Sequence, residues 1–184
     1  LSNSLASVRL NPMGVFFVAD IQHDTLETRF SGVQAMDTFS VNDRGFLIAG
    51  GDDEGLSLFE LLPDGTLFHH QSLGQSSGWA LGPVQAIATV SYAEQIDIFV
   101  AGSRVGGIAQ IVLETDRFGA RQFGGNGQDQ LTGTELDDML VGNGGNDILR
   151  GGTGDDTLVS GAGSDVLEGG GGADVFVFTT DGLV

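Results

Sequence analysis

Six aspartates recur at intervals of nine residues in the last third of the chain and are its clearest candidates for chemistry. They are Asp129, Asp138, Asp147, Asp156, Asp165 and Asp174. Carboxylate oxygens and backbone carbonyls are the ligands that Ca²⁺ prefers, with six to eight of them at roughly 2.3–2.6 Å. The chain contains no Cys, which excludes thiolate metal sites and disulfides. These residue types therefore fit a hard cation such as Ca²⁺.

A large apolar residue stands two positions after each of these aspartates. These residues are Leu131, Leu140, Leu149, Leu158, Leu167 and Phe176. The most regular copies read GGNGQDQLT (124–132), GGTGDDTLV (151–159) and GGGGADVFV (169–177). Because Gly tolerates positive φ, the first six residues of a copy can turn tightly and aim carbonyls inward. The next three are predicted to form a short strand whose middle side chain faces a core.

This pattern resembles the RTX (hemolysin-type) calcium-binding repeat, G-G-x-G-x-D-x-U-x, in which U is large and apolar. The resemblance covers residues 124–177 and implies a parallel β-roll of about three turns, with two repeats in each turn. Alternate repeats would stack on one edge, which implies calcium sites between the aspartate pairs 129/147, 147/165, 138/156 and 156/174. The second repeat has Thr134 and Leu136 in place of two glycines, so this departure falls on the expected site between Asp138 and Asp156.

Folding of the roll is expected to depend on calcium. Six apolar side chains bury little surface against the ordering entropy of a Gly-rich segment, and stacked carboxylates repel one another without a cation. The resemblance further implies type I secretion from a Gram-negative bacterium, and hence a secreted, extracellular or cell-surface protein. The chain begins with Leu1 rather than Met, and only residues 178–184 follow the repeats. We therefore expect it to be a piece of a longer protein.

Charge and composition exclude several partners. The chain has 25 acidic residues against 7 basic ones and a formal net charge of −18. Such a surface is unsuited to nucleic acid or to an anionic membrane, and no apolar run is long enough for membrane insertion as a helix. Residues 1–123 hold 14 of the 31 glycines and residues 124–184 hold the other 17. This shift predicts two domains, 1–120 and 121–184, with a boundary near Gly119 to Gly124.

The N-terminal part is predicted to be antiparallel β-structure, so the whole chain is predicted to be all-β. Apolar runs of strand length are separated by turn residues such as those at 63–66. Three pairs of segments match at a spacing of 51 or 52 residues: 33–36 with 84–87, 46–50 with 98–102, and 55–59 with 107–111. This spacing resembles a four-stranded β-propeller blade. About two and a half blades fit, so either further blades precede them in a longer chain or the strands form a smaller stack or sandwich.

Two motifs of the N-terminal part could suggest catalysis. Ser76 lies in a G-x-S-x-G match at 74–78, but a nucleophile elbow needs a following helix, which the segment 79–83 with its Gly and Pro cannot begin. His69 and His70 are adjacent on a predicted strand and would point to opposite faces, and the chain has no H-E-x-x-H. We interpret the first motif as a loop and the histidines as ordinary surface or edge residues.

Other conspicuous residues are assigned structural roles. The acidic trio at 52–54 is interpreted as a solvated turn, with an additional cation site as the alternative. Trp79 and Tyr92 are expected to pack within the blades.

The sequence thus predicts a non-enzymatic calcium-binding segment of a secreted or surface RTX-type protein. Its N-terminal β-region would serve binding, adhesion or assembly, so a protein or surface partner and self-assembly both stay open. The alternative is a fragment of an exported enzyme, such as a propeller hydrolase, whose β-roll is the folding and export module.

Overall fold

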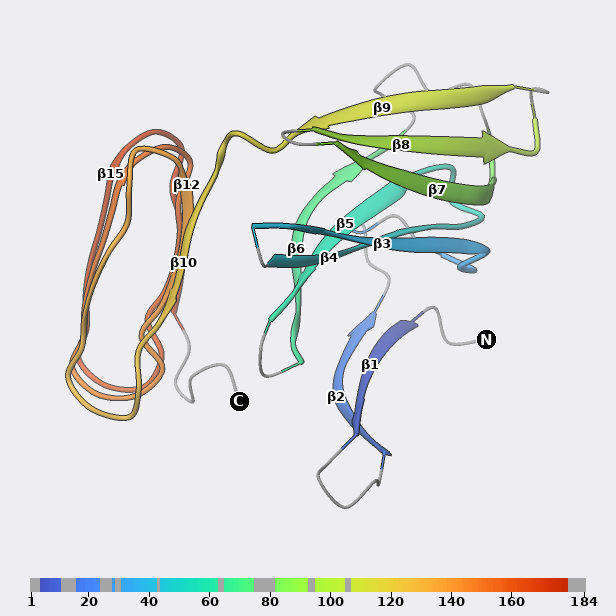
Figure 1. Cartoon of the computed structure of the whole chain (residues 1–184). Coiled ribbons are helices and arrows are strands. Elements are labelled where there is room, and N and C mark those ends of the chain that lie inside the picture. The colour runs from blue at the N-terminus through green and yellow to red at the C-terminus, as the bar shows by residue number, and fades with distance from the viewer. Residues whose placement is uncertain are drawn as a thin grey trace. The chain divides into compact units, whose positions relative to one another are not determined.

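The computed structural model describes residues 4–10, 16–23, 28, 31–42, 44–62, 65–74, 82–92, 95–104 and 107–178 (Figure 1). The regular elements of these residues are all β-strands, which confirms the predicted all-β class. The chain divides into two compact units, Leu1–Thr115 and Asp116–Val184. No helix capable of spanning a membrane occurs in the described part of the chain.

The first unit contains three antiparallel sheets. β1 (Ser4–Leu10) pairs with β2 (Phe16–His23). The second sheet has the order β3 (Ala35–Val41), β4 (Arg44–Gly50), β5 (Leu56–Leu61) and β6 (Leu67–Leu73). The third has the order β7 (Val84–Tyr92), β8 (Gln95–Gly102) and β9 (Ile108–Glu114). The predicted antiparallel β-region is therefore confirmed, while its assembly into a propeller stays a prediction.

The 51- to 52-residue spacing corresponds to matching strands of the second and third sheets. β3, β4 and β5 correspond in order to β7, β8 and β9. The residues that follow β9 at the same spacing form β10 (Phe118–Phe123), which would be the fourth strand of that sheet. Instead, β10 pairs in parallel with β12 (Asp137–Val141) in the second unit. The predicted domain boundary between residues 120 and 121 falls inside this strand.

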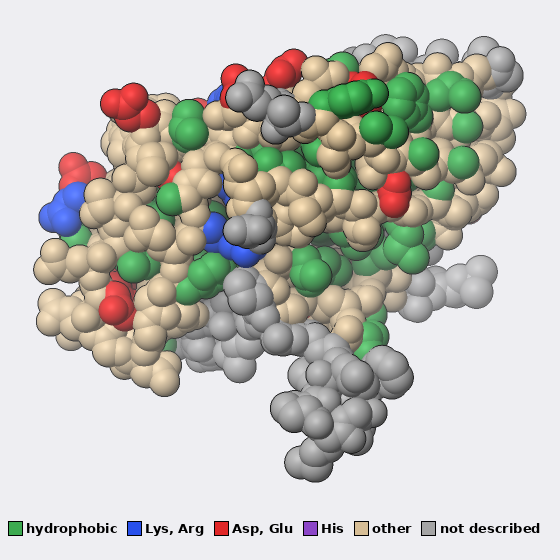
Figure 2. Space-filling model, in the orientation of Figure 1, with side chains coloured by type: hydrophobic (Ala, Val, Ile, Leu, Met, Phe, Trp, Pro, Cys, Tyr) green, Lys and Arg blue, Asp and Glu red, His purple; other side chains and the backbone are tan. Residues whose placement is uncertain are grey.

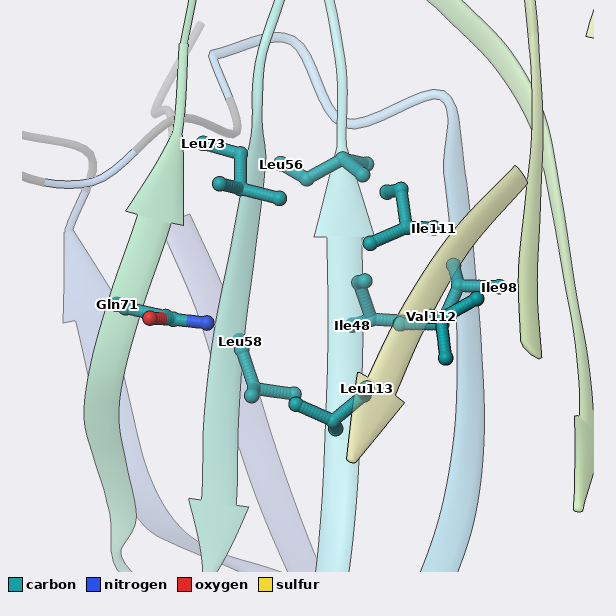
Figure 3. Close-up of a pocket in the computed structure, with 9 residues that line it drawn as sticks. All are labelled: Ile48, Leu56, Leu58, Gln71, Leu73, Ile98, Ile111, Val112 and Leu113. Carbon is teal, nitrogen blue, oxygen red and sulfur yellow. The ribbon is translucent and has the colours of Figure 1, made fainter. Parts of the chain in front are cut away.

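The cores of the first unit are aliphatic and aromatic. One buried cluster joins Leu5 of β1 to Ala49, Phe59 and Leu67 of the second sheet. The facing sides of the second and third sheets leave a cavity of about 210 Å³ between them (Figure 3). Its lining is Ile48, Leu56, Leu58, Gln71, Leu73, Ile98, Ile111, Val112 and Leu113. Gln71 is the one polar side chain of this lining, so the two sheets face each other here through aliphatic side chains.

The second unit is a parallel β-roll of about three turns, as predicted. One of its sheets contains β11 (Gln130–Thr132), β13 (Ile148–Thr153) and β15 (Val166–Gly171). The other contains β10, β12, β14 (Thr157–Val159) and β16 (Val175–Val177). Figure 1 shows these strands as the long sides of stacked coils. Each repeat thus lies directly over the repeat two before it.

The inward apolar residues form the core between the two sheets. Leu131, Leu140, Leu149 and Leu158 are buried together, and Leu167 packs against them partly buried. The prediction is wrong for Phe176, which is 42% exposed. Phe176 lies on β16, the last strand of its sheet, so no further described turn covers it. The core is therefore complete only where another turn stacks above.

The roll begins one strand earlier than the repeats indicate. Gln122 of β10 is aligned with Leu140 of β12, so a polar side chain stands where the repeats place an inward Leu. Its Nε2 donates a hydrogen bond to the Thr132 carbonyl at 2.7 Å. β10 therefore closes the start of the roll with a polar residue that hydrogen-bonds the carbonyl at the end of β11.

Candidate metal centre

The first six residues of each repeat form a loop, and the loops stack at the two edges of the roll. Loops 1, 3 and 5 are residues 124–129, 142–147 and 160–165, and loops 2, 4 and 6 are residues 133–138, 151–156 and 169–174. The parallel registers of the strands that follow them place loops of one set directly over one another. The aspartates consequently lie in two columns, with 129, 147 and 165 in one and 138, 156 and 174 in the other.

A hydrogen bond links each stacked pair of aspartates that the sequence predicted. The backbone N–H of the lower aspartate donates to Oδ1 of the aspartate one turn above. The donor–acceptor distances are 2.9 Å for Asp129 to Asp147, 2.9 Å for Asp147 to Asp165, 2.9 Å for Asp138 to Asp156 and 3.1 Å for Asp156 to Asp174. The structure thus brings all six predicted residues together as four adjacent pairs.

Two of these carboxylates have a buried oxygen with no hydrogen-bond partner. Asp147 is 1% exposed and Asp156 is fully buried. In each, Oδ1 accepts the backbone hydrogen bond from below, whereas Oδ2 is buried without any partner. Burying an ionised carboxylate oxygen without a compensating partner is strongly unfavourable. A bound cation would provide that partner.

The space beside these oxygens is kept free of side chains by glycine. A Cβ added at Gly142 would lie 2.6 Å from Oδ2 of Asp147 and would press on the Ser160 carbonyl of the next loop. A Cβ added at Gly151 would lie 2.6 Å from the Gly169 carbonyl oxygen and would press on Oδ2 of Asp156. A carboxylate oxygen of one loop and a carbonyl oxygen of the next therefore border the same small space.

The donor set consists of oxygens. Among the described residues, no three or more His, Cys, Asp or Glu side chains are grouped so that they could hold a metal ion. A site in these columns must therefore combine two carboxylates with backbone carbonyls. The Ser160 and Gly169 carbonyls, which border the same spaces as Oδ2 of Asp147 and Asp156, are such carbonyls. Hard oxygen donors of this kind fit Ca²⁺ and not a thiolate- or imidazole-bound metal.

Electrostatics in the column disfavour the metal-free charged state. Burial raises the pKa of Asp156 above its ordinary value, and the negative charges of Asp138, Asp174 and Asp137 raise the pKa further. The backbone hydrogen bond from Asp138 opposes this shift only in part. A divalent cation between the loops would remove this repulsion, since opposite charge favours the ionised carboxylate.

Further polar side chains, at the fifth position of the repeats, were not predicted from the sequence. Asp137 and Asp155 form an outer column on the edge of loops 2 and 4, and Asn146 has the same position in loop 3 on the other edge. Each stands immediately before one of the predicted ligand aspartates. Oδ1 of Asn146 accepts the Ser164 N–H at 2.9 Å, and Oδ1 of Asp155 accepts the Ala173 N–H at 2.8 Å. The signal was present, because these three residues are also nine apart. They tie stacked loops together on the outer side.

Arg117 completes this outer column at the start of the roll. Its Nε lies 3.2 Å from Oδ2 of Asp137 and its Nη2 lies 3.0 Å from Oδ2 of Asp155. The charge of Asp137 is the main cause of a raised pKa for Arg117. The pKa of Asp155 is lowered mainly by the Ala173 N–H and also by Arg117. These acids are therefore engaged in the framework, which leaves the inner aspartates for a cation.

The adjacent histidines contact different residues. His69 Nε2 lies 2.9 Å from Ser72 Oγ, and the His69 ring packs on Phe59. His70 Nε2 instead lies 2.9 Å from Oε2 of Glu60. The two side chains therefore have separate partners, Ser72 on β6 and Glu60 on β5. Ser76 and Trp79 lie outside the described residues.

The acidic trio forms a turn with partners of its own. Glu54 Oε1 pairs with Arg104 Nη2 at 2.5 Å, and Asp52 accepts a hydrogen bond from Gln34. These contacts favour the interpretation as a structural turn over a cation site. Tyr92 is 60% exposed, so the prediction that it packs within the sheets is wrong. It is the last residue of β7, where the side chain lies at the end of the sheet.

Comparison with known families agrees with this geometry. The model of the RTX calcium-binding nonapeptide repeat (4 copies) matches residues 123–158 and 150–178. Residues 123–178 are thus RTX calcium-binding repeats, and the resemblance inferred from the sequence is confirmed there. A search of curated proteins found no match to the chain. The repeats imply calcium binding by the β-roll.

Proposed function

We propose that this chain is a non-enzymatic, calcium-binding module of a secreted or cell-surface protein, and that its β-roll folds when calcium binds. The observation that carries the proposal is the pair of buried, unpartnered oxygens, Oδ2 of Asp147 and of Asp156. Each faces a space that a carbonyl oxygen of the next loop also borders. These positions combine negative charge, burial and oxygen donors, which is the environment that selects Ca²⁺.

The aspartate columns and the carbonyls of the stacked loops would hold the ions. Bound calcium would supply the positive charge that allows carboxylates of neighbouring turns to be buried side by side. Since the two loops of a site come together only in the folded roll, calcium binds the folded state and stabilises it by mass action. Extracellular calcium modules typically bind with Kd values of about 10⁻⁴–10⁻³ M. The roll would then stay unfolded in a compartment poor in calcium and fold outside the cell.

This dependence on calcium suits export of an unfolded chain. RTX repeats support type I secretion from a Gram-negative bacterium, followed by folding at the cell surface or in the medium. The net charge of −18 and the absence of Cys agree with a module stabilised by calcium and not by disulfides.

The first unit would serve binding, adhesion or assembly. Figure 2 shows hydrophobic side chains at the surface over the sheet of β7, β8 and β9. Ile108 on β9 is 72% exposed, and Val90, Tyr92 and Val112 of the same sheet are also exposed. Several apolar side chains exposed on one sheet are candidates for contact with another protein. Discrete oligomers in solution would favour self-assembly, and monomers would favour a separate partner.

The cavity between the second and third sheets offers no group for acid–base or nucleophilic chemistry, because its lining is aliphatic apart from Gln71 (Figure 3). The alternative proposal is an exported enzyme with the roll as its folding and export module. Its catalytic side chains would converge on a pocket other than this cavity.

A calcium titration of the full chain tests the proposed function. Far-UV circular dichroism is recorded in chelator and then with increasing CaCl₂, with MgCl₂ as the control. We expect the first unit to give a β-signal in chelator and the roll to add a further β-signal with calcium alone. A spectrum that is unchanged by millimolar calcium would overturn calcium-driven folding.

A further inference from the structure

The first two loops of the roll differ in backbone conformation from the loops above them. In loops 3 to 6 the second residue lies in the left-handed region of φ. These residues are Asn143 (φ 67°), Gly152 (121°), Gly161 (90°) and Gly170 (111°). In loops 1 and 2 the second residues are Gly125 and Thr134, and neither has this conformation. The loops that begin each column therefore present different backbone groups to their own aspartates.

In the first two loops the backbone hydrogen-bonds the aspartate of the same loop. The N–H of Gly125 donates to Oδ2 of Asp129 at 2.7 Å. The N–H of Thr134 donates to Oδ2 of Asp138 at 2.5 Å, and Thr134 Oγ1 lies 3.1 Å from Oδ1 of Asp138. Ala120 of β10 also donates its N–H to Oδ1 of Asp138. Both oxygens of Asp138 are thus engaged by protein donors.

In loops 3 and 4 the corresponding oxygen has no protein donor. Oδ2 of Asp147 and Oδ2 of Asp156 are buried and unpartnered, although both residues follow the same nine-residue pattern. The left-handed residues Asn143 and Gly152 do not turn an N–H toward these oxygens. A buried, unpartnered carboxylate oxygen gains most from a cation, because no protein donor offsets the cost of its burial, whereas a hydrogen bond from the protein already offsets part of that cost.

We infer that the roll holds two tight calcium sites and not the four implied by the repeats. One lies between loops 3 and 5, with Asp147 as its principal carboxylate, and the other between loops 4 and 6, with Asp156. Asp129 and Asp138 instead close the start of the two columns through hydrogen bonds. This inference rests on the proposed function, since it assigns residues and stoichiometry to calcium binding.

The number of tight sites in the unaltered full chain is the first test. Calcium is removed with chelator, and CaCl₂ binding is then measured by isothermal titration calorimetry and equilibrium dialysis. We expect about two tight ions per chain, with any further binding at least tenfold weaker. Four equivalent ions would overturn the inference and leave the proposed function intact. An absence of calcium binding would overturn both.

Matched variants assign the sites to residues. Asp147→Asn and Asp156→Asn keep an acceptor for the hydrogen bond from below and remove the unpartnered charge, so each should lose one tight ion. Asp129→Asn and Asp138→Asn should keep two. Far-UV circular dichroism at saturating calcium checks that each variant folds. If a variant does not fold, the number of tight calcium ions bound by the unaltered chain still tests the inference. Loss of a tight ion in Asp129→Asn or Asp138→Asn would overturn the assignment.

Discussion

Asp155 donates its backbone N–H to Oδ1 of Asp137, one turn nearer the start of the roll, over 2.8 Å. At the next position along the loop the direction reverses, because Asp138 donates its N–H to Oδ1 of Asp156 one turn further on, over 2.9 Å. Two adjacent positions thus carry hydrogen-bond ladders of opposite direction. Each loop is thereby bonded to the loop stacked on it through both side chains and backbone.

The outer ladder predicts different effects for two substitutions of one residue. Asp155→Ala removes the acceptor of the Ala173 N–H and also the ion pair with Arg117. Asp155→Asn removes only the charge and keeps an acceptor oxygen. Because exposed ion pairs contribute little to stability, we expect Asp155→Ala to lower the melting temperature of the calcium-loaded roll clearly more than Asp155→Asn. Thermal unfolding followed by circular dichroism measures both, and equal losses would contradict the role given to the acceptor.

Two glycines at the same position of neighbouring loops should respond differently to alanine. Gly145 has a φ of 128°, and a Cβ there would press on the Gly127 carbonyl below it. A Cβ at Gly127 itself would meet no atom within 4 Å. We expect Gly145→Ala to destabilise the calcium-loaded roll by about 1–3 kcal/mol and Gly127→Ala by less than about 0.5 kcal/mol.

Chemical unfolding at saturating calcium measures both glycine variants. Gly127→Ala is the internal control, because it makes the same chemical change one turn earlier. Similar losses in the two variants would show that the stacking of loops does not depend on a bare Cα at this position.

The nine-residue period made the roll predictable, because it records directly which side chain of each repeat must be apolar or acidic. Stacking of alternate repeats follows from that period, and with it the two aspartate columns. β10 could not be found in this way, because Gln122 stands where the repeats require Leu and no loop aspartate accompanies it. A strand at the end of a solenoid caps the stacked repeats, so its residues do not follow the repeat pattern.

The sequence likewise did not predict that the aspartates of loops 1 and 2 differ in hydrogen bonding from those of loops 3 and 4. Asn143 and Thr134 occupy the same repeat position and both replace Gly, but only Asn143 lies in the left-handed region. The difference arises from what lies beneath each loop, since loop 2 is the first loop of its column and stacks on none. Exposure of Phe176 has the same origin at the other end of the roll. The backbone conformation and the exposure of these residues thus depend on what packs against them and not on residue type.

The position of β10 predicts where the roll can be separated from the rest of the chain. A fragment of residues 116–184 keeps Arg117, β10 and the hydrogen bond from Ala120 to Asp138. A fragment of residues 124–184 keeps every repeat but loses all of these contacts. We expect the longer fragment to fold at a calcium concentration several-fold lower than the shorter one. Calcium titrations by circular dichroism compare them directly, and identical midpoints would show that β10 is dispensable.

A buried ion pair in the first unit predicts sensitivity to acid. Glu60 is fully buried and accepts hydrogen bonds from Arg44 at 3.1 and 2.8 Å, and His70 lies 2.9 Å away. Burial alone would raise the pKa of Glu60, but His70 and Arg44 outweigh it and lower the pKa from 4.5 to about 2. Because the folded-state pKa is depressed, the stabilisation is fully present above about pH 5. It is lost as the pH falls from about 4.5 toward 2.

Replacement of Glu60 by Gln isolates this contribution. Glu60→Gln leaves the Arg44 guanidinium buried beside a neutral amide, so we expect a loss of roughly 3 kcal/mol at pH 7. Lowering the pH should narrow the stability difference between the unaltered chain and the variant, since the unaltered chain then loses the same charge. Urea unfolding of both proteins from pH 7 to pH 2.5 gives this difference directly. Titration of other groups affects both proteins equally and therefore cancels in the difference. A difference that stays constant over this range would show that Glu60 does not ionise as its contacts indicate.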